Sequence, residues 1–155
     1  MPNTSSPLAN RLAFTAKQQV LLEPFEIGSP GDDEVLIEIH ISLMSTGTEN
    51  IIYNRLFESG SHWDQWVKYP FYPGYTSVGK VVAVGHAVTH LRKGDRVACR
   101  AGHTSHSIVK AATCCVIPPD LEFDQAVWFA LAKIGYHGAL AANHHLGDRD
   151  RKSVV

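Results

Sequence analysis

Histidine and cysteine side chains, which are common protein ligands of zinc, gather in two places along the sequence. Cys99, His103 and His106 lie close together, and His144 and His145 are adjacent. On one strand or loop, the first group can in principle bring three ligands to a metal ion. No second cluster completes it. We therefore expect ordinary surface histidines, or buried histidines with satisfied hydrogen bonds, rather than a functional metal.

The size and charge of the chain narrow the classes of partner. Its 155 residues suit one ordinary domain, and 45% hydrophobic residues can form a real core. A net charge of -1 argues against nucleic-acid binding, which normally needs a basic surplus. No apolar stretch approaches the ~20 residues that span a bilayer, and residues 1–10 lack the features of a secretory signal. Three cysteines make no disulfide scaffold, so we expect a cytoplasmic protein without membrane contact.

Short strands separated by turns are predicted over most of the first 118 residues. The clearest is 34–42, where apolar and polar residues alternate as on a half-buried strand. Further candidates are 11–15, 19–23, 80–85, 95–99 and 107–110. The β-branched run at 80–85 should be well buried. Many short strands with frequent turns indicate a sandwich or a barrel.

Helices are predicted in two regions. A short helix over 49–57 can end at Gly60. Nearer the C-terminus, 123–132 and 135–145 carry Ala, Leu and aromatic side chains at helical spacing. Residues 152–155 resemble the beginning of another buried strand, so we interpret the end of the chain as a cut inside a longer protein.

Three segments carry a family resemblance. They are residues 45–49 (STGTE), 72–85 (YPGYTSVGKVVAVG) and 93–97 (KGDRV). In this order and spacing they resemble the N-terminal catalytic domain of the medium-chain dehydrogenase/reductase superfamily, the group of zinc alcohol dehydrogenases and quinone reductases. Within it, the motifs look most like the bacteriochlorophyllide alcohol dehydrogenase-like subgroup.

The resemblance implies a mainly β fold. It is a GroES-like, partly open β-barrel, followed by linking helices and then by a Rossmann α/β domain that binds NAD or NADP. We therefore expect residues 1–10 to be flexible, residues 11–125 to form the GroES-like domain, and residues 126–155 to hold the linking helices and the first Rossmann strand. The Gly-rich phosphate-binding turn would follow Val155, so the chain alone should not bind the dinucleotide tightly.

Zinc-dependent members of this superfamily use a cysteine in the first motif and a His-Glu pair in the second. Here Thr46 stands in place of the cysteine, and Tyr75 and Thr76 stand in place of the pair. Residues 130–133, where a further ligand belongs, hold no thiolate, imidazole or carboxylate. Because a catalytic zinc needs about three such ligands, we expect no zinc.

Hydroxyl groups and one carboxylate then remain for chemistry. Thr48 matches the Ser/Thr of the family that relays a proton from the substrate alcohol. Tyr75 can donate a hydrogen bond to a developing alkoxide or enolate. Glu49 matches the acidic residue that supports the metal shell, and here it can orient Tyr75 or Thr46. Two alternatives stay open: Thr48 can be a loop hydroxyl that bonds its own backbone, and Tyr75 an ordinary rim aromatic.

Other side chains are expected to surround the substrate and cofactor. The residues assigned to substrate binding are Thr46, Thr76, Trp63 and Trp66. Packing of the core or of a lid explains the two tryptophans equally well. Gly47 and Tyr136 are expected near the cofactor, although helix packing is an alternative for Tyr136.

Two functions fit these features. The first is the substrate-binding domain of a zinc-independent, NAD(P)-dependent oxidoreductase whose small-molecule substrate is an alcohol, a carbonyl or a conjugated alkene. Macrocycle, sugar and secondary alcohol substrates all remain open, and the full-length enzyme is expected to be a homodimer. The second is a stand-alone, non-catalytic GroES-like binding or assembly module. The apolar C-terminal residues favour the enzyme.

Overall fold

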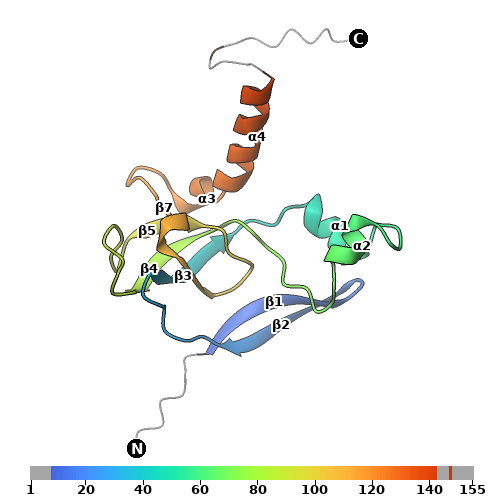
Figure 1. Cartoon of the computed structure of the whole chain (residues 1–155), viewed down its shortest axis with the longest axis horizontal. Coiled ribbons are helices and arrows are strands. Elements are labelled where there is room, and N and C mark those ends of the chain that lie inside the picture. Colours follow the sequence, from blue (N-terminus) through green and yellow to red (C-terminus); the bar gives the residue numbers. More distant parts are fainter. Residues whose placement is uncertain (1–7, 143–146, 148–155) are drawn as a thin grey trace, which may run out of the picture.

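The structure is a computed structural model that describes residues 8–142 and 147. Its described part is mainly β and contains two separate antiparallel sheets (Figure 1). One sheet pairs β1 (Leu8–Ala16) with β2 (Gln19–Glu26). The other has the order β6-β3-β4-β5-β7, in which the strands are β3 (Glu34–Ser42), β4 (Ser77–Val84), β5 (Arg96–Cys99), β6 (His106–Lys110) and β7 (Cys115–Val116).

The two sheets are linked but do not close into a barrel within the described residues. Isolated bridges join Arg11 to Thr104 and Phe14 to Phe71, so β1 contacts loops that belong to the larger part of the molecule. The expected mainly β, partly open architecture is confirmed.

The predicted strands are present, although β2 and β4 have other bounds than predicted and β7 was not predicted. Strand β1 begins at Leu8, so residues 8–10 lie in a strand instead of in the flexible N-terminal segment that we expected. Strand β4 is less buried than predicted: Val81 is buried, whereas Val84 is 39% exposed. Successive side chains of a strand point to opposite faces, and only one face of β4 lies against well-packed core residues at this end.

The helices are short except for the last. They are α1 (Thr48–Asn54), α2 (His62–Trp66), α3 (Phe123–Ala126) and α4 (Phe129–Ala141), with a 3-10 turn η1 at Ala111–Thr113. Helix α1 does not reach Gly60, because Arg55 adopts a left-handed backbone conformation (φ 51°) that ends it. Helix α2 was not predicted. Helix α4 continues through residues 133–134, where the sequence predicted a break between two helices.

Two hydrophobic clusters hold the larger sheet in place. One lies along β3, β4 and β5 and includes Val35, Ile37 and Val81. The other packs Ala126 and Val127, at the end of α3, against β4 and β5. Helix α4 extends away from both sheets (Figure 1), and Ala130 is its buried residue.

Candidate functional site

A cavity of about 280 Å³ lies beside the first turn of α1 and the loop that leads into β4. Its lining residues are Thr48, Glu49, Ile52, Trp66, Phe71, Tyr72, Gly74, Tyr75 and Arg100. The structure therefore brings the three predicted catalytic residues, Thr48, Glu49 and Tyr75, to one cavity. Of the predicted substrate-binding residues, Trp66 lines it.

The two predicted proton donors are both available to a ligand. Thr48 is the first residue of α1, and both Thr48 and Tyr75 are half-buried. In the part of the chain that the structure describes, neither hydroxyl makes a hydrogen bond. The alternative in which Thr48 bonds its own backbone is thus not what the structure has. Two unengaged hydroxyls in one cavity can bind and protonate an oxygen atom.

Tyr75 is placed by the glycine that precedes it. Gly74 has a φ of +99°, and a Cβ atom there would lie 2.6 Å from the backbone nitrogen of His103. This close approach lets the backbone N–H of His103 donate to the carbonyl of Pro73 at 2.9 Å. Only glycine allows both features, so the loop that carries Tyr75 is held against the segment after β5.

Glu49 has a different partner from the two that we expected. Its carboxylate is buried, and Oε1 lies 3.1 Å from Nε2 of His103. Oε2 accepts a hydrogen bond from the backbone N–H of Ser45 at 3.0 Å, and Nδ1 of His103 lies 2.8 Å from the hydroxyl of Ser42. The prediction that Glu49 orients Tyr75 or Thr46 is therefore wrong, because the fold brings the loop between β5 and β6 beside α1.

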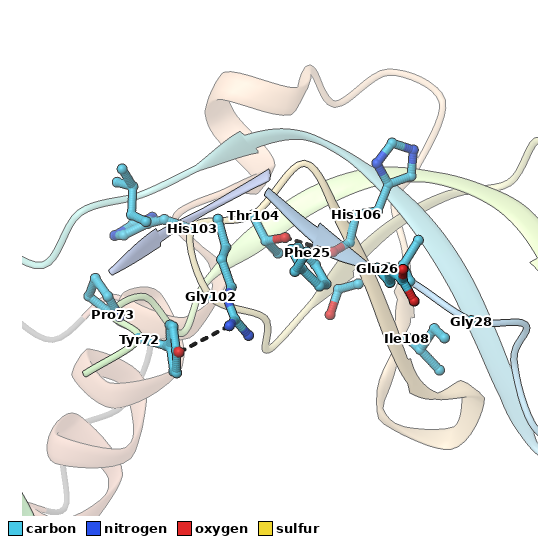
Figure 2. Close-up of a pocket in the computed structure, with 14 residues that line it drawn as sticks. Phe25, Glu26, Gly28, Tyr72, Pro73, Gly102, His103, Thr104, His106 and Ile108 are labelled. Atoms are coloured by element: carbon cyan, nitrogen blue, oxygen red, sulfur yellow. Dashed lines mark hydrogen bonds between the residues drawn. The ribbon is translucent and has the colours of Figure 1, made fainter. Parts of the chain in front are cut away.

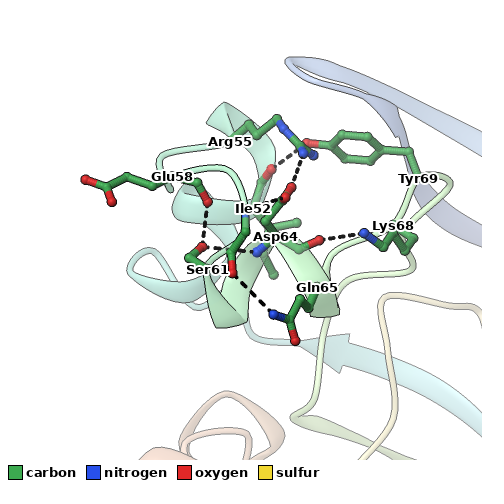
Figure 3. Close-up of polar contacts among 9 residues, drawn as sticks. Ile52, Arg55, Glu58, Ser61, Asp64, Gln65, Lys68 and Tyr69 are labelled. Carbon is green, nitrogen blue, oxygen red and sulfur yellow. Dashed lines mark hydrogen bonds and ion pairs between the residues drawn. The ribbon is translucent and has the colours of Figure 1, made fainter.

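Polar contacts between α1 and α2 set the position of α1 (Figure 3). Asp64 forms an ion pair with Arg55 and accepts a hydrogen bond from the backbone N–H of Gly60 at 2.9 Å. The hydrogen bond from Gly60 holds the pKa of Asp64 below its usual value, and the positive charges of Arg55 and Lys68 lower it further. Below these contacts, Ile52 packs with other buried side chains. The first turn of α1 is thereby kept at the cavity.

The other predicted site residues lie elsewhere. Thr76 is fully buried and donates to the carbonyl of Val127 at 2.6 Å, so its hydroxyl is not free for a substrate. Trp63 packs on the cluster around Ile52 and lines none of the described cavities. Tyr136 is 58% exposed on α4 and does not line them either.

Thr46 and Gly47 lie beside the cavity but do not line it. Thr46 lines a separate space of about 460 Å³, together with Met44 and Tyr53. Gly47 precedes α1 with an ordinary φ of -74°, and a Cβ atom there would meet nothing within 4 Å. Neither its backbone nor packing within the described residues requires glycine at this position.

A further space of about 410 Å³ lies between β2 and the loop after β5 (Figure 2). Phe25, Tyr72 and His103 line it, and Arg11 donates to the hydroxyl of Tyr72 at 3.0 Å. None of the predicted site residues lines this space. Sequence reasoning missed two residues that the structure places at the candidate site: His103, as the partner of Glu49, and Arg100.

The residues at the zinc positions of the family do not fit a zinc ion. Thr46 and Tyr75 line different cavities, and the Thr76 hydroxyl is occupied by Val127. Over residues 8–142 and 147, no group of three or more His, Cys, Asp or Glu side chains is arranged to share a metal. Burial raises the pKa of the Cys99 thiol to about 12, so without a metal ion it stays protonated near neutral pH.

None of the helices described in the structure has the length and apolar character needed to cross a membrane.

Comparison with known proteins places this geometry in a family. Residues 31–144 match the alcohol dehydrogenase GroES-like domain. The chain is 30% identical over 105 residues to an alcohol dehydrogenase of Moraxella sp. (strain TAE123), covering 63% of this chain and 28% of that protein. It is 29% identical over 159 residues to a sorbitol dehydrogenase of Gallus gallus, covering 83% and 43% respectively.

Solved structures share the fold. A quinone oxidoreductase of Escherichia coli, complexed with NADPH, aligns with a TM-score of 0.66 at 21% identity, over 88% of this chain and 42% of that one. An Escherichia coli oxidoreductase/dehydrogenase of unknown specificity aligns with a TM-score of 0.73 at 17% identity, over 92% and 49%. The chain spans less than half the length of each of these relatives. It belongs to the alcohol dehydrogenase GroES-like domain family, within the medium-chain dehydrogenase/reductase superfamily.

Proposed function

We propose that this chain is the substrate-binding domain of an NAD(P)-dependent oxidoreductase that acts, without zinc, on an alcohol, a carbonyl or a conjugated alkene. The observation that carries the proposal is the pair of unengaged hydroxyls, Thr48 and Tyr75, in one cavity. The relatives named alcohol dehydrogenase and sorbitol dehydrogenase support alcohol chemistry.

The two hydroxyls have complementary roles in this proposal. When a carbonyl is reduced, negative charge develops on its oxygen, and a donor already in place stabilises that charge without reorganisation. Tyr75 donates a hydrogen bond to this oxygen. Thr48 can both accept and donate, so it passes the proton between the oxygen and its surroundings. The buried pair of Glu49 and His103 lies under them and holds the first turn of α1 in place.

The hydride would come from or go to a nicotinamide. An NADPH-bound quinone oxidoreductase among the structural relatives supports this choice of cofactor. We propose that the dinucleotide is bound mainly outside these 155 residues, with Gly47 offering open space for its approach. The chain alone is then expected to give no turnover, and the full-length enzyme is expected to be a homodimer.

The test is turnover by the full-length enzyme with NADH or NADPH across alcohols, ketones and conjugated alkenes. Removing one preorganised donor typically costs a hundredfold to a thousandfold in turnover. We therefore expect Tyr75→Phe and Thr48→Ala each to lower kcat by about a hundredfold or more. Activity should survive treatment with a zinc chelator.

Tyr72→Phe is the matched control. Tyr72 lines the same cavity, but its hydroxyl already accepts a hydrogen bond from Arg11. This variant should keep near-native turnover. Near-native turnover in both Tyr75→Phe and Thr48→Ala would contradict the proposed roles, and a full-length protein inactive on all three substrate classes would favour a non-catalytic binding module.

A further inference from the structure

Arg100 follows β5 directly and brings a positive charge to the candidate site. It lines the cavity that also contains Thr48 and Tyr75. The central carbon of its guanidinium group, Cζ, lies 5.5 Å from the centroid of the Tyr75 ring. At this distance the ring face attracts the cation and limits the directions in which the long side chain can point. The guanidinium group is thus held beside the proposed donor to the substrate oxygen.

The charge of Arg100 is not neutralised by the residues around it. The other arginines of the described chain are engaged: Arg11, Arg55 and Arg92 form ion pairs with carboxylates, and Arg96 donates to two backbone carbonyls. Between residues 8 and 142, Arg100 makes neither an ion pair nor a hydrogen bond. A cation without a partner, at the wall of a cavity, can be paired by a bound anion.

Glu49 cannot supply that negative charge. It is the only carboxylate among the residues that line the cavity. Its side chain is 4% exposed, and its two oxygens already contact His103 and the backbone N–H of Ser45. The polar groups left in the lining for a ligand are therefore the Arg100 guanidinium group and the hydroxyls of Thr48, Tyr72 and Tyr75.

We propose that Arg100 selects a substrate that carries an anionic group, a carboxylate or a phosphate, on the same small molecule as the reacting oxygen. This inference rests on the proposed function and names its substrate class. The planar guanidinium fork matches the two oxygens of a carboxylate or phosphate, which makes the recognition geometric as well as electrostatic. A volume of about 280 Å³ is small for a ligand pocket, so the substrate is itself small.

The pyrophosphate of the cofactor is the other possible source of an anion. Two observations favour the substrate. Arg100 shares its cavity with Thr48 and Tyr75, the groups assigned to the substrate oxygen. Gly47 and Tyr136, the residues assigned to the cofactor, do not line that cavity.

The experiment is an NMR titration of the 155-residue chain, observed at the indole N–H of Trp66, which lines the cavity. The probes are 4-(hydroxymethyl)benzoate and its neutral counterpart, benzyl alcohol, with inorganic pyrophosphate as a third. The Kd of the benzoate should rise about tenfold or more in Arg100→Gln. In Arg100→Lys it should take a value between those of the unmodified chain and of Arg100→Gln. The Kd of benzyl alcohol should stay the same in all variants.

Arg92→Gln is the matched control, because the Arg92 side chain is 90% exposed and does not line the cavity. Its Kd values should equal those of the unmodified chain. An equal benzoate Kd in the unmodified chain and Arg100→Gln would overturn the inference, as would no response of Trp66 to the benzoate. If Arg100→Gln weakened the binding of benzoate and of benzyl alcohol equally, Arg100 would only shape the cavity. If pyrophosphate alone bound in an Arg100-dependent way, the residue would belong to the cofactor site. Both outcomes overturn the inference. The titration needs no turnover, so its failure is distinct from a failure of the proposed function.

Discussion

At the scale of single residues, Glu49 shows how the candidate site is supported from below. It and Ile52 are the buried residues of α1, one helical turn apart on the same face. A buried carboxylate is stable only when its oxygens are paired. His103 and the backbone N–H of Ser45 provide those partners. The pair therefore links the helix that carries Thr48 to the segment that follows β5.

The first prediction concerns the stability of this pair. His103→Leu leaves the Glu49 carboxylate buried without its main partner, and loss of one partner of a buried pair typically costs on the order of 3–5 kcal/mol. Glu49→Leu should also destabilise the fold. The double variant should lose less stability than the sum of the two single variants, because it leaves no buried charge without a partner. Unfolding in urea, measured for all four proteins, checks this.

His106→Leu serves as the control for this cycle. His106 lies close by, and its ring hydrogen-bonds only to the hydroxyl of Ser105. Its loss should cost about 1 kcal/mol. If the losses of unfolding free energy in Glu49→Leu and His103→Leu simply added up in the double variant, the pair would have no energetic role of its own.

At the scale of elements, the loop before β4 decides where the candidate donor Tyr75 lies. The loop approaches the segment after β5 so closely that a side chain on Gly74 would collide with the backbone of Gly102 and His103. On the other side, Thr76 bonds the carbonyl of Val127 at the end of α3. Tyr75 is thus fixed between two anchored neighbours.

The second prediction is that Gly74→Ala destabilises the fold by about 1–3 kcal/mol, because a non-glycine residue is strained at a φ of +99°. The matched control is Gly47→Ala, where φ is -74° and the new methyl group meets nothing within 4 Å. It should change the free energy of unfolding by only a few tenths of a kcal/mol. Urea unfolding of both variants measures the difference, and equal stabilities would contradict the assigned strain.

At the scale of the whole molecule, the three cysteines lie at three depths. Cys99 is buried in the sheet, Cys114 is half-buried and Cys115 is exposed. Burial, with a smaller effect of the neighbouring Cys115, raises the pKa of the Cys114 thiol to about 11. Burial likewise raises the pKa of Cys99 to about 12. The thiolate is the reactive form of cysteine. Burial and a raised pKa therefore both lower the reactivity of a thiol.

The third prediction is therefore an order of labelling by a thiol-specific disulfide reagent. Cys115 should react first, Cys114 more slowly, and Cys99 only after unfolding. Below its pKa of about 11, the thiolate fraction of Cys114 grows about tenfold for each pH unit, so its labelling rate should rise by that factor between pH 7 and pH 8. Mass spectrometry of the peptides assigns each rate. Early labelling of Cys99 in the folded chain would contradict the packing of β5.

Local patterns in the sequence were sufficient to locate most of the strands. The alternation over 34–42 predicted β3 with the bounds that the structure has, since a strand half-buried on one face leaves a period of two in its residues. The positions of Thr48 and Tyr75 in their motifs also led to two residues that share a cavity. In both cases, the information lies within a few neighbouring residues.

Only the tertiary structure decided the partners and the exposure of the site residues. Glu49 and His103 are 54 positions apart, and nothing in either segment indicates the other. Thr76 left the predicted site because α3 packs over its hydroxyl, and Arg100 joined the cavity because β5 delivers it beside Tyr75. Periodicity and propensity record which face of an element is buried. They do not record what lies against that face, because long-range contacts depend on how distant segments pack together.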